Sequence, residues 1–127
     1  MTQEEKDLLL KDLCSRLDTN LVCSIYRTDD EGVGYRDEIL HGYCKGDIWY
    51  EFYFREDCSI GIDNVSKIKP CLLPLSSMTK EQKKYIRDNY TFGATHELFD
   101  WLDKNKFDYR GLIDKGLAID ATGLNIY

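Results

Sequence analysis

Residues 35–55 read YRDEILHGYCKGDIWYEFYFR, and this stretch decides the fold that we expect. It is rich in aromatic residues, and apolar positions alternate with polar ones, as is typical of strands that bury one face. Residues 35–44 and 48–55 are therefore predicted to form the two arms of a β-hairpin. Gly46-Asp47 between them suits a type II′ turn, in which glycine takes the first central position.

Charged residues indicate the register of this hairpin. With Gly46-Asp47 as the loop, Glu38 lies opposite Arg55, whereas a loop at Lys45-Gly46 would set Arg36 against Arg55. Like charges directly opposite each other destabilise a strand pair, so the first register is favoured.

Either register divides the hairpin into two faces. The face expected to join the core carries mainly apolar residues, namely Ile39, His41, Tyr43, Ile48, Tyr50, Phe52 and Phe54. The opposite face carries Trp49, Glu51, Tyr53 and Arg55.

A helix and a strand are predicted before the hairpin. Thr2 and Glu5 form a capping box that opens a helix over residues 2–17. Its apolar stripe has helical spacing and contains Leu9, Leu10, Leu13, Cys14 and Leu17. Its polar face contains Glu4, Asp7, Lys11 and Arg16. Residues 21–27 are rich in β-forming residues and predict a strand.

Two more strands and further helices are predicted after the hairpin. Residues 59–63 are expected to add a third arm, and residues 65–73 an edge strand, because Pro70 has no amide to donate. Thr79 and Gln82 form a second capping box, which opens a helix to about residue 90. A third helix is expected from Thr95 to about Lys104, then a short turn that Asp108 caps, a stop at Gly116 and an irregular tail.

These elements predict a single α+β domain over residues 1–127. We expect an N-terminal helix within residues 1–20, a four- to five-stranded antiparallel meander within residues 21–73, and a helical C-terminal part over residues 74–127. A small SH3-like or Sm-like barrel is a further refinement, with bends supplied by Gly34, Gly42 and Gly61.

Composition narrows the class of protein. The net charge of −6 argues against a general binder of nucleic acid or anionic membranes, because no basic excess is available to neutralise phosphates. No apolar run approaches the ~18 residues of a membrane span, and the acidic N-terminus lacks the order of a signal peptide. The five cysteines are scattered singly, which indicates reduced thiols in a cytoplasm.

Few residues suggest catalysis or metal binding. His41 and Cys44 lie three apart, but a structural zinc site needs four ligands, and these two point to opposite faces in the favoured register. His96, Glu97 and Asp100 have the spacing of an acid–base group, which is also the spacing of a solvated helix face. No thiol lies in a recognisable nucleophile motif. We therefore expect no catalytic residue, metal or cofactor.

The predicted outer face of the hairpin is the candidate interaction surface. Trp49, Tyr53 and Arg55, with Tyr35 nearby, would form an aromatic and basic stripe. Such residues dominate protein interfaces and also stack on single-stranded bases. The alternative is that a helix of the same domain covers this face.

Three segments resemble a known family: EEKDLLLKDLC at residues 4–14, IKPCLLPLSSMT at residues 68–79, and FDYRGLI at residues 107–113 running on to Tyr127. They are similar to small uncharacterised proteins of gut bacteria of the Bacteroides group and of their phages or mobile elements. The resemblance covers about half of the chain and excludes residues 22–64. It implies a bacterial or phage protein of the cytoplasm and carries no activity or site residues.

The leading hypothesis is a non-enzymatic protein-binding or adaptor module that contacts a host or phage protein through the sheet. The segments that carry the family resemblance would form a scaffold, and the hairpin of residues 35–57 would be a variable recognition surface. A small nucleic-acid-associated regulator and an enzyme of unseen class are the alternatives.

Overall fold

The computed structural model describes residues 1–29, 32–45, 50–55, 58–90 and 96–127. Its helices are α1 (Gln3–Ser15), α2 (Lys80–Asn89) and α3 (His96–Lys104), with two 3₁₀ helices, η1 (Ile62–Lys67) and η2 (Leu75–Ser77). Its strands are β1 (Val22–Asp29), β2 (Gly32–Ile39), β3 (Gly42–Lys45), β4 (Tyr50–Arg55), β5 (Cys58–Gly61), β6 (Ile68–Pro74), β7 (Phe107–Asp108) and β8 (Ile119–Asp120). The α+β class is confirmed.

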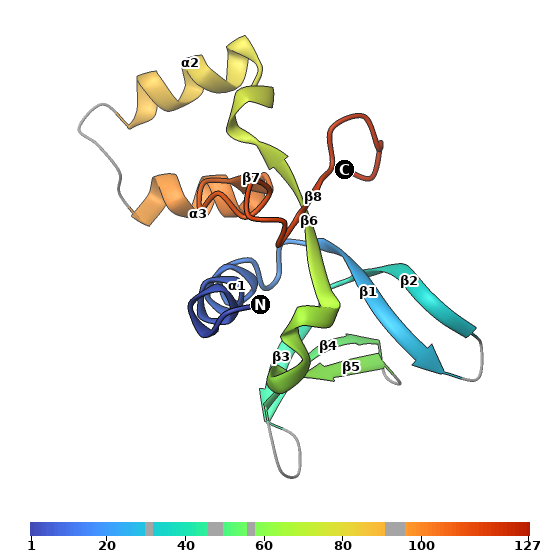
Figure 1. Ribbon diagram of the computed structural model, residues 1–127. Helices are drawn as coiled ribbons and strands as arrows, with labels where there is room; N and C mark the ends of the chain where they lie inside the picture. The colour runs from blue at the N-terminus through green and yellow to red at the C-terminus, as the bar shows by residue number, and fades with distance from the viewer. Residues whose placement is uncertain (30–31, 46–49, 56–57, 91–95) are drawn as a thin grey trace.

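The strands form two sheets. The larger one has the order β2-β1-β6-β7, and β8 also pairs with β6. It is antiparallel except for the two short parallel pairs that β7 and β8 make with β6. In Figure 1 the helices lie to the left of β6, and the β1–β2 hairpin extends to the right.

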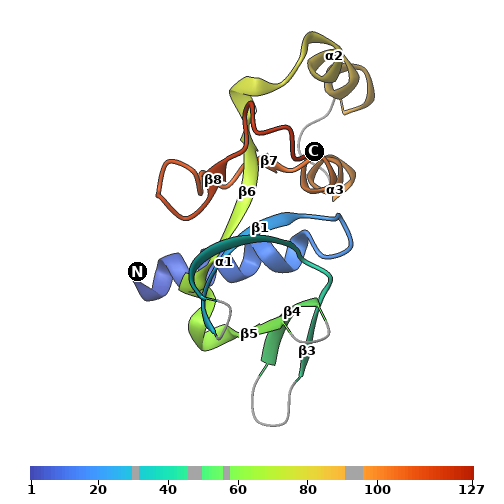
Figure 2. The same ribbon diagram turned by 90° about the vertical axis from the view of Figure 1, so that its right-hand side faces the viewer.

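The smaller sheet has the order β3-β4-β5 and is antiparallel. Figure 2 shows it below the β1–β2 hairpin. The described strands therefore do not close into the barrel that the glycine positions suggested.

The predicted pairing of residues 35–44 with residues 48–55 is wrong in two respects. Residues 35–39 belong to β2 and pair with β1, so that Glu38 lies opposite Cys23 instead of Arg55. Of the predicted first arm, only β3 pairs with β4, and Gly42 lies opposite Tyr53. The register that sets Glu38 against Arg55 would have placed Leu40 there. The turn at Gly46-Asp47 lies outside the described residues.

Backbone hydrogen bonds show where the predicted arm of residues 35–44 divides between the two sheets. The amide of Leu40 donates to the carbonyl of Leu21 (2.8 Å), whereas the amide of His41 donates to the carbonyl of Tyr53 (2.9 Å). The chain thus passes from one sheet to the other between these two residues. β1, which precedes this segment in the chain, pairs with residues 32–39 in place of β4. The sequence of the segment itself does not reveal this competing partner.

The expected core face of the hairpin is only partly buried. Phe52 and Phe54 are fully buried, but Ile39, His41 and Tyr43 are exposed. Leu40, which was not among the residues of the expected core face, is buried. The change of sheet after Ile39 accounts for this.

β6 is not the edge strand that Pro70 suggested. It lies between β1 and the short strands β7 and β8. Pro70 is opposite Cys23 of β1, whereas β7 and β8 pair with β6 only from Cys71 onward. In the described part of the chain, Pro70 therefore has a strand on one side only, as proline requires.

Both predicted capping boxes are present. Thr2 accepts from the amide of Glu5, and Thr79 accepts from the amide of Gln82, each with the reciprocal side-chain bond. α2 buries no side chain, because most of its residues are polar.

One hydrophobic cluster joins α1, both sheets and the C-terminal part. Leu9 and Leu13 of α1, Ile25 of β1, Phe52 of β4 and Leu112 after β7 all belong to it. None of the helices that the structure describes has the length and apolar character needed to cross a lipid bilayer.

A candidate binding cleft between the two sheets

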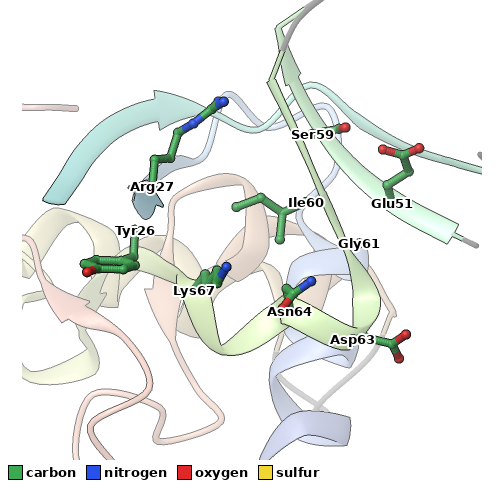
Figure 3. Close-up of a pocket in the computed structure, with 9 residues that line it drawn as sticks. All are labelled: Tyr26, Arg27, Glu51, Ser59, Ile60, Gly61, Asp63, Asn64 and Lys67. Atoms are coloured by element: carbon green, nitrogen blue, oxygen red, sulfur yellow. The ribbon is translucent and has the colours of Figure 1, made fainter. Parts of the chain in front are cut away.

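A cleft of about 410 Å³ lies where the two sheets meet. Its lining comes from β1, β4, β5 and η1, and consists of Tyr26, Arg27, Glu51, Ser59, Ile60, Gly61, Asp63, Asn64 and Lys67 (Figure 3). We call it the inter-sheet cleft. Its volume falls in the range of ordinary ligand pockets.

The 3₁₀ helix η1 forms the floor of the inter-sheet cleft. It follows β5 directly, and its Val65 is fully buried in the core. This anchor leaves Asp63, Asn64 and Lys67 exposed on the opposite side of the helix. Burial of Val65 thus orients η1 so that these three polar side chains face the inter-sheet cleft.

Charges are separated across the inter-sheet cleft. Figure 3 shows Arg27 and Lys67 on the left of the view and Glu51 and Asp63 on the right. The cleft therefore has a basic wall and an acidic wall, which suits a ligand group that carries both charges or a strong dipole.

Two of the four predicted interaction residues flank the inter-sheet cleft. The ring of Tyr35 packs edge-on against that of Tyr26, with centroids 5.2 Å apart. Tyr53 is exposed and lies opposite Ser59, so both side chains emerge on one face of the smaller sheet. Trp49 and the side chain of Arg55 lie outside the described residues.

β2 presents a row of exposed side chains beside the inter-sheet cleft. Val33, Tyr35 and Ile39 are 73%, 57% and 41% exposed, and Asp37 between them is exposed as well. Alternate residues of a strand share a face, so these four form one row. In the described part of the chain β2 pairs only with β1, which leaves its other edge open.

Sequence reasoning missed Asp63 and Lys67 because it assigned residues 59–63 and 65–73 to strands, and it gave Asn64, between them, no role. The pair Asp63-Asn64 was the available signal, since these residues favour turns and local hydrogen bonds over strands.

Neither the cysteine thiols nor the pair of His41 and Cys44 forms a reactive or metal-binding site in the described part of the chain. His41 is exposed, the side chain of Cys44 lies outside the described residues, and no cluster of metal-binding side chains occurs in the described ranges. Cys14, Cys23 and Cys71 are free thiols. Burial raises the pKa of all three, that of Cys71 to about 11, which leaves little reactive thiolate at neutral pH.

The acid–base candidates on α3 are split. His96 and Asp100 line a second cavity, whereas Glu97 is exposed and does not. This cavity also contains Asp103, Tyr109 and Arg110, which the sequence did not single out. Comparison with protein-family models, with curated proteins and with solved structures found no match to this chain.

Proposed function

We propose that this protein is a non-enzymatic protein-binding or adaptor module, whose partner docks on β2 and the adjoining inter-sheet cleft. The observation that carries the proposal is the row of Val33, Tyr35 and Ile39. These large apolar side chains lie exposed along one eight-residue strand at the edge of a sheet. Isolated exposed apolar residues are ordinary, but three on one face of an open edge strand favour association with another chain.

The open edge of β2 favours an extended segment as the docking element. Such a segment adds a strand to the sheet through main-chain hydrogen bonds, and its alternate side chains provide the specificity. Asp37 interrupts the apolar row of β2 with a negative charge. The best partner segment therefore has apolar residues at alternate positions and a lysine or arginine opposite Asp37, which the net charge of −6 also favours.

The inter-sheet cleft adds polar selectivity to this mode of binding. Tyr35 on β2 contacts Tyr26, whose side chain lines the cleft, so a partner that covers Tyr35 also reaches its entrance. The opposed basic and acidic walls would then select a polar group of the partner. A purely apolar partner would leave these charges desolvated without compensation.

The proposal places the protein in the cytoplasm of a bacterium or an infected host cell, with a host or phage protein as the partner. The free thiols of Cys14, Cys23 and Cys71 support a reducing compartment. The bacterial or phage origin rests on the family resemblance of the two ends of the chain.

Affinity capture with quantitative mass spectrometry, with and without nuclease, tests the proposal. We would compare wild type with Val33→Lys, which replaces the most exposed apolar residue on β2. Leu124→Lys is the matched control, because Leu124 is a half-exposed apolar residue of the C-terminal tail and does not belong to β2. Both substitutions lie at exposed positions and should leave the fold intact.

We expect a nuclease-resistant partner that Val33→Lys loses at least tenfold and Leu124→Lys retains. Asp37→Asn should weaken binding of the purified partner and reduce its dependence on salt, because an opposing cation loses its counter-charge. Equal capture by wild type and Val33→Lys would refute the docking surface. Capture that disappears with nuclease would support the nucleic-acid alternative instead.

A further inference from the structure

A second cavity, of about 450 Å³, lies between α1, α3 and the segment that follows β7. It is remote in sequence from β2 and plays no part in the proposed docking of a partner. Ser15, His96, Phe99, Asp103, Tyr109 and Arg110 contribute to its lining. We call it the α1–α3 cavity.

A buried charge cluster lies behind the α1–α3 cavity, and two of its members, Asp103 and Arg110, line the cavity. Asp12 and Arg16 are both fully buried and are joined by two hydrogen bonds of 3.0 Å. Arg110 adds a third bond to Asp12 at 2.8 Å, and Asp103 lies 3.9 Å from Arg16. Two carboxylates and two guanidinium groups balance one another, so a ligand with no net charge disturbs this cluster least.

Asp103 has one carboxylate oxygen held and one available. Its Oδ1 accepts hydrogen bonds from the hydroxyls of Ser15 (3.1 Å) and Tyr109 (2.7 Å). Its Oδ2 accepts none from the described residues, although Asp103 is only 5% exposed and lines the cavity. This oxygen is not fully shielded from solvent, so it can accept a hydrogen bond from an N–H group of a ligand in the cavity. Burial of the residue raises the pKa of Asp103.

Arg110 has donors that remain available. All its hydrogen bonds to described residues run through Nη1, to Asp12 and to Ser15 (3.1 Å), which leaves Nη2 and Nε. Its side chain is 14% exposed and stacks over the ring of Tyr109, 4.5 Å from the centroid. A guanidinium held in this way is suited to bind a carboxylate.

The acceptor on Asp103 and the donors on Arg110 lie close together. Nη1 of Arg110 is 3.8 Å from Oδ1 of Asp103. A ligand that satisfies both must carry an amino group and a carboxylate a short distance apart, as on the α-carbon of an amino acid. Beside them, the exposed ring of Phe99 packs against Tyr109 with centroids 5.1 Å apart, and provides an aromatic surface.

We propose that the α1–α3 cavity binds a free aromatic α-amino acid. The ammonium group donates to Oδ2 of Asp103, the carboxylate accepts from Nη2 or Nε of Arg110, and the aromatic ring stacks on Phe99. Lys11, His96 and Asp100 complete the lining and surround the bound ligand.

Titration of the ¹⁵N-labelled full-length protein with L-phenylalanine, L-tyrosine and L-tryptophan tests the proposal. Two analogues separate the contacts, since 3-phenylpropionate lacks the amino group and 2-phenylethylamine lacks the carboxylate. We expect at least one amino acid to shift the amides around Ser15, Phe99 and Arg110. Each analogue should bind at least tenfold more weakly, because a buried polar group then stays unpaired.

Asp103→Asn is the decisive variant. It retains an oxygen that accepts from Ser15 and Tyr109, and replaces Oδ2 with a donor that repels an ammonium group. We expect at least tenfold weaker binding of the amino acid and unchanged binding of 3-phenylpropionate. Glu97→Gln, on the same helix but outside the cavity, is the matched control and should bind like wild type.

Phe99→Ala provides a second variant should Asp103→Asn fail to fold, because the Phe99 ring is partly solvent-exposed. It should weaken binding of the amino acid without loss of structure. The proposal is overturned by any of three results. These are no shift with all three amino acids up to about 10 mM, shifts confined to other surfaces, or wild-type affinity in a folded Asp103→Asn or Phe99→Ala variant.

Discussion

Replacement of Arg16 with methionine should destabilise the protein strongly. Arg16 is fully buried at the C-terminal end of α1, where it donates twice to Asp12 and once to the carbonyl of Phe107 at 2.7 Å. In Arg16→Met, Asp12 would stay buried with Arg110 as its remaining cationic partner, and the carbonyl of Phe107 would lose this donor.

The expected loss of unfolding free energy follows from the buried charge of Asp12, which Arg16 would no longer compensate. Loss of one member of a buried ion pair costs about 3–5 kcal/mol, chiefly because the remaining charge is uncompensated. Domains of this size unfold with about 5–15 kcal/mol, so at least about a fifth of the stability would be lost. At about 4 °C per kcal/mol, the midpoint of thermal unfolding should fall by roughly 12–20 °C.

Removal of both charges should restore most of this loss. Asp12→Leu with Arg16→Met leaves no buried carboxylate on α1, and such apolar replacements are often neutral. Urea unfolding followed by circular dichroism would measure the wild type, both single variants and the double variant. Lys11→Met, at an exposed position of the same helix, should change the free energy of unfolding by no more than about 0.5 kcal/mol.

The reasoning is refuted if Arg16→Met costs less than about 1 kcal/mol, or if the double variant is as unstable as the sum of the single ones. The first result would mean that water or Arg110 compensates Asp12 fully. The second would mean that the two side chains contribute independently through packing, without coupling.

Three further predictions concern the cap of α2, the reactivity of the cysteines and the titration of Asp103. Thr79→Ala removes the cap of α2 and should cost that helix about 1 kcal/mol; because α2 buries no side chain, hydrogen exchange over residues 80–89 should quicken while the thermal midpoint barely moves. Alkylation of the native protein, read by peptide mass spectrometry, should modify exposed Cys14 before buried Cys23 and Cys71, and a reverse order would contradict the burial. Burial raises the pKa of Asp103 above its ordinary 3.8, so the folded state holds that proton to a higher pH than the unfolded state does. The unfolding free energy of wild type relative to Asp103→Asn should therefore fall as the pH rises from about 3.8 through the folded pKa, and a rise would show that hydrogen bonds outweigh desolvation.

Features set by neighbouring residues could be predicted from the sequence. Each capping box joins residues three apart, Thr2 with Glu5 and Thr79 with Gln82, so the signal lies within one helical turn. The turn that Asp108 caps is likewise local, since its carboxylate accepts from the amides of Leu112 and Ile113 (2.9 Å each).

Features set by distant residues could not be predicted. The Glu38–Arg55 pairing sets opposite charges against each other, yet residues 35–39 pair with β1. Helical periodicity assigned Arg16 to the polar face of its helix, but this residue follows the last turn and is buried beneath α3 and β7. Its partners there, Asp103 and Phe107, lie 87 and 91 positions along the chain.

The two candidate sites differ in how much of them the sequence revealed. Tyr35 and Tyr53 could be singled out because aromatic residues on an outer strand face are visible as a pattern. The α1–α3 cavity unites Ser15 with Arg110, 95 positions away, and no pattern within α1 signals this contact. Only His96 and Asp100 were noticed, and the carboxylate that matters most to the proposed ligand, Asp103, was not.

The family resemblance proposed for residues 4–14, 68–79 and 107–127 supplies a test that separates these sites. Asp12, Tyr109 and Arg110 fall within these three segments, whereas β2 and most of the inter-sheet cleft fall within residues 22–64, outside them. A scaffold with an exchangeable recognition surface predicts that relatives retain Asp12 and Arg110 while the row on β2 differs among them. Exchange of residues 35–57 between two relatives should then transfer partner choice and leave amino-acid binding at the α1–α3 cavity unchanged. Partner choice that stays with the ends would refute the assignment of recognition to β2. Amino-acid binding that travels with the exchanged segment would refute the α1–α3 cavity as the ligand site.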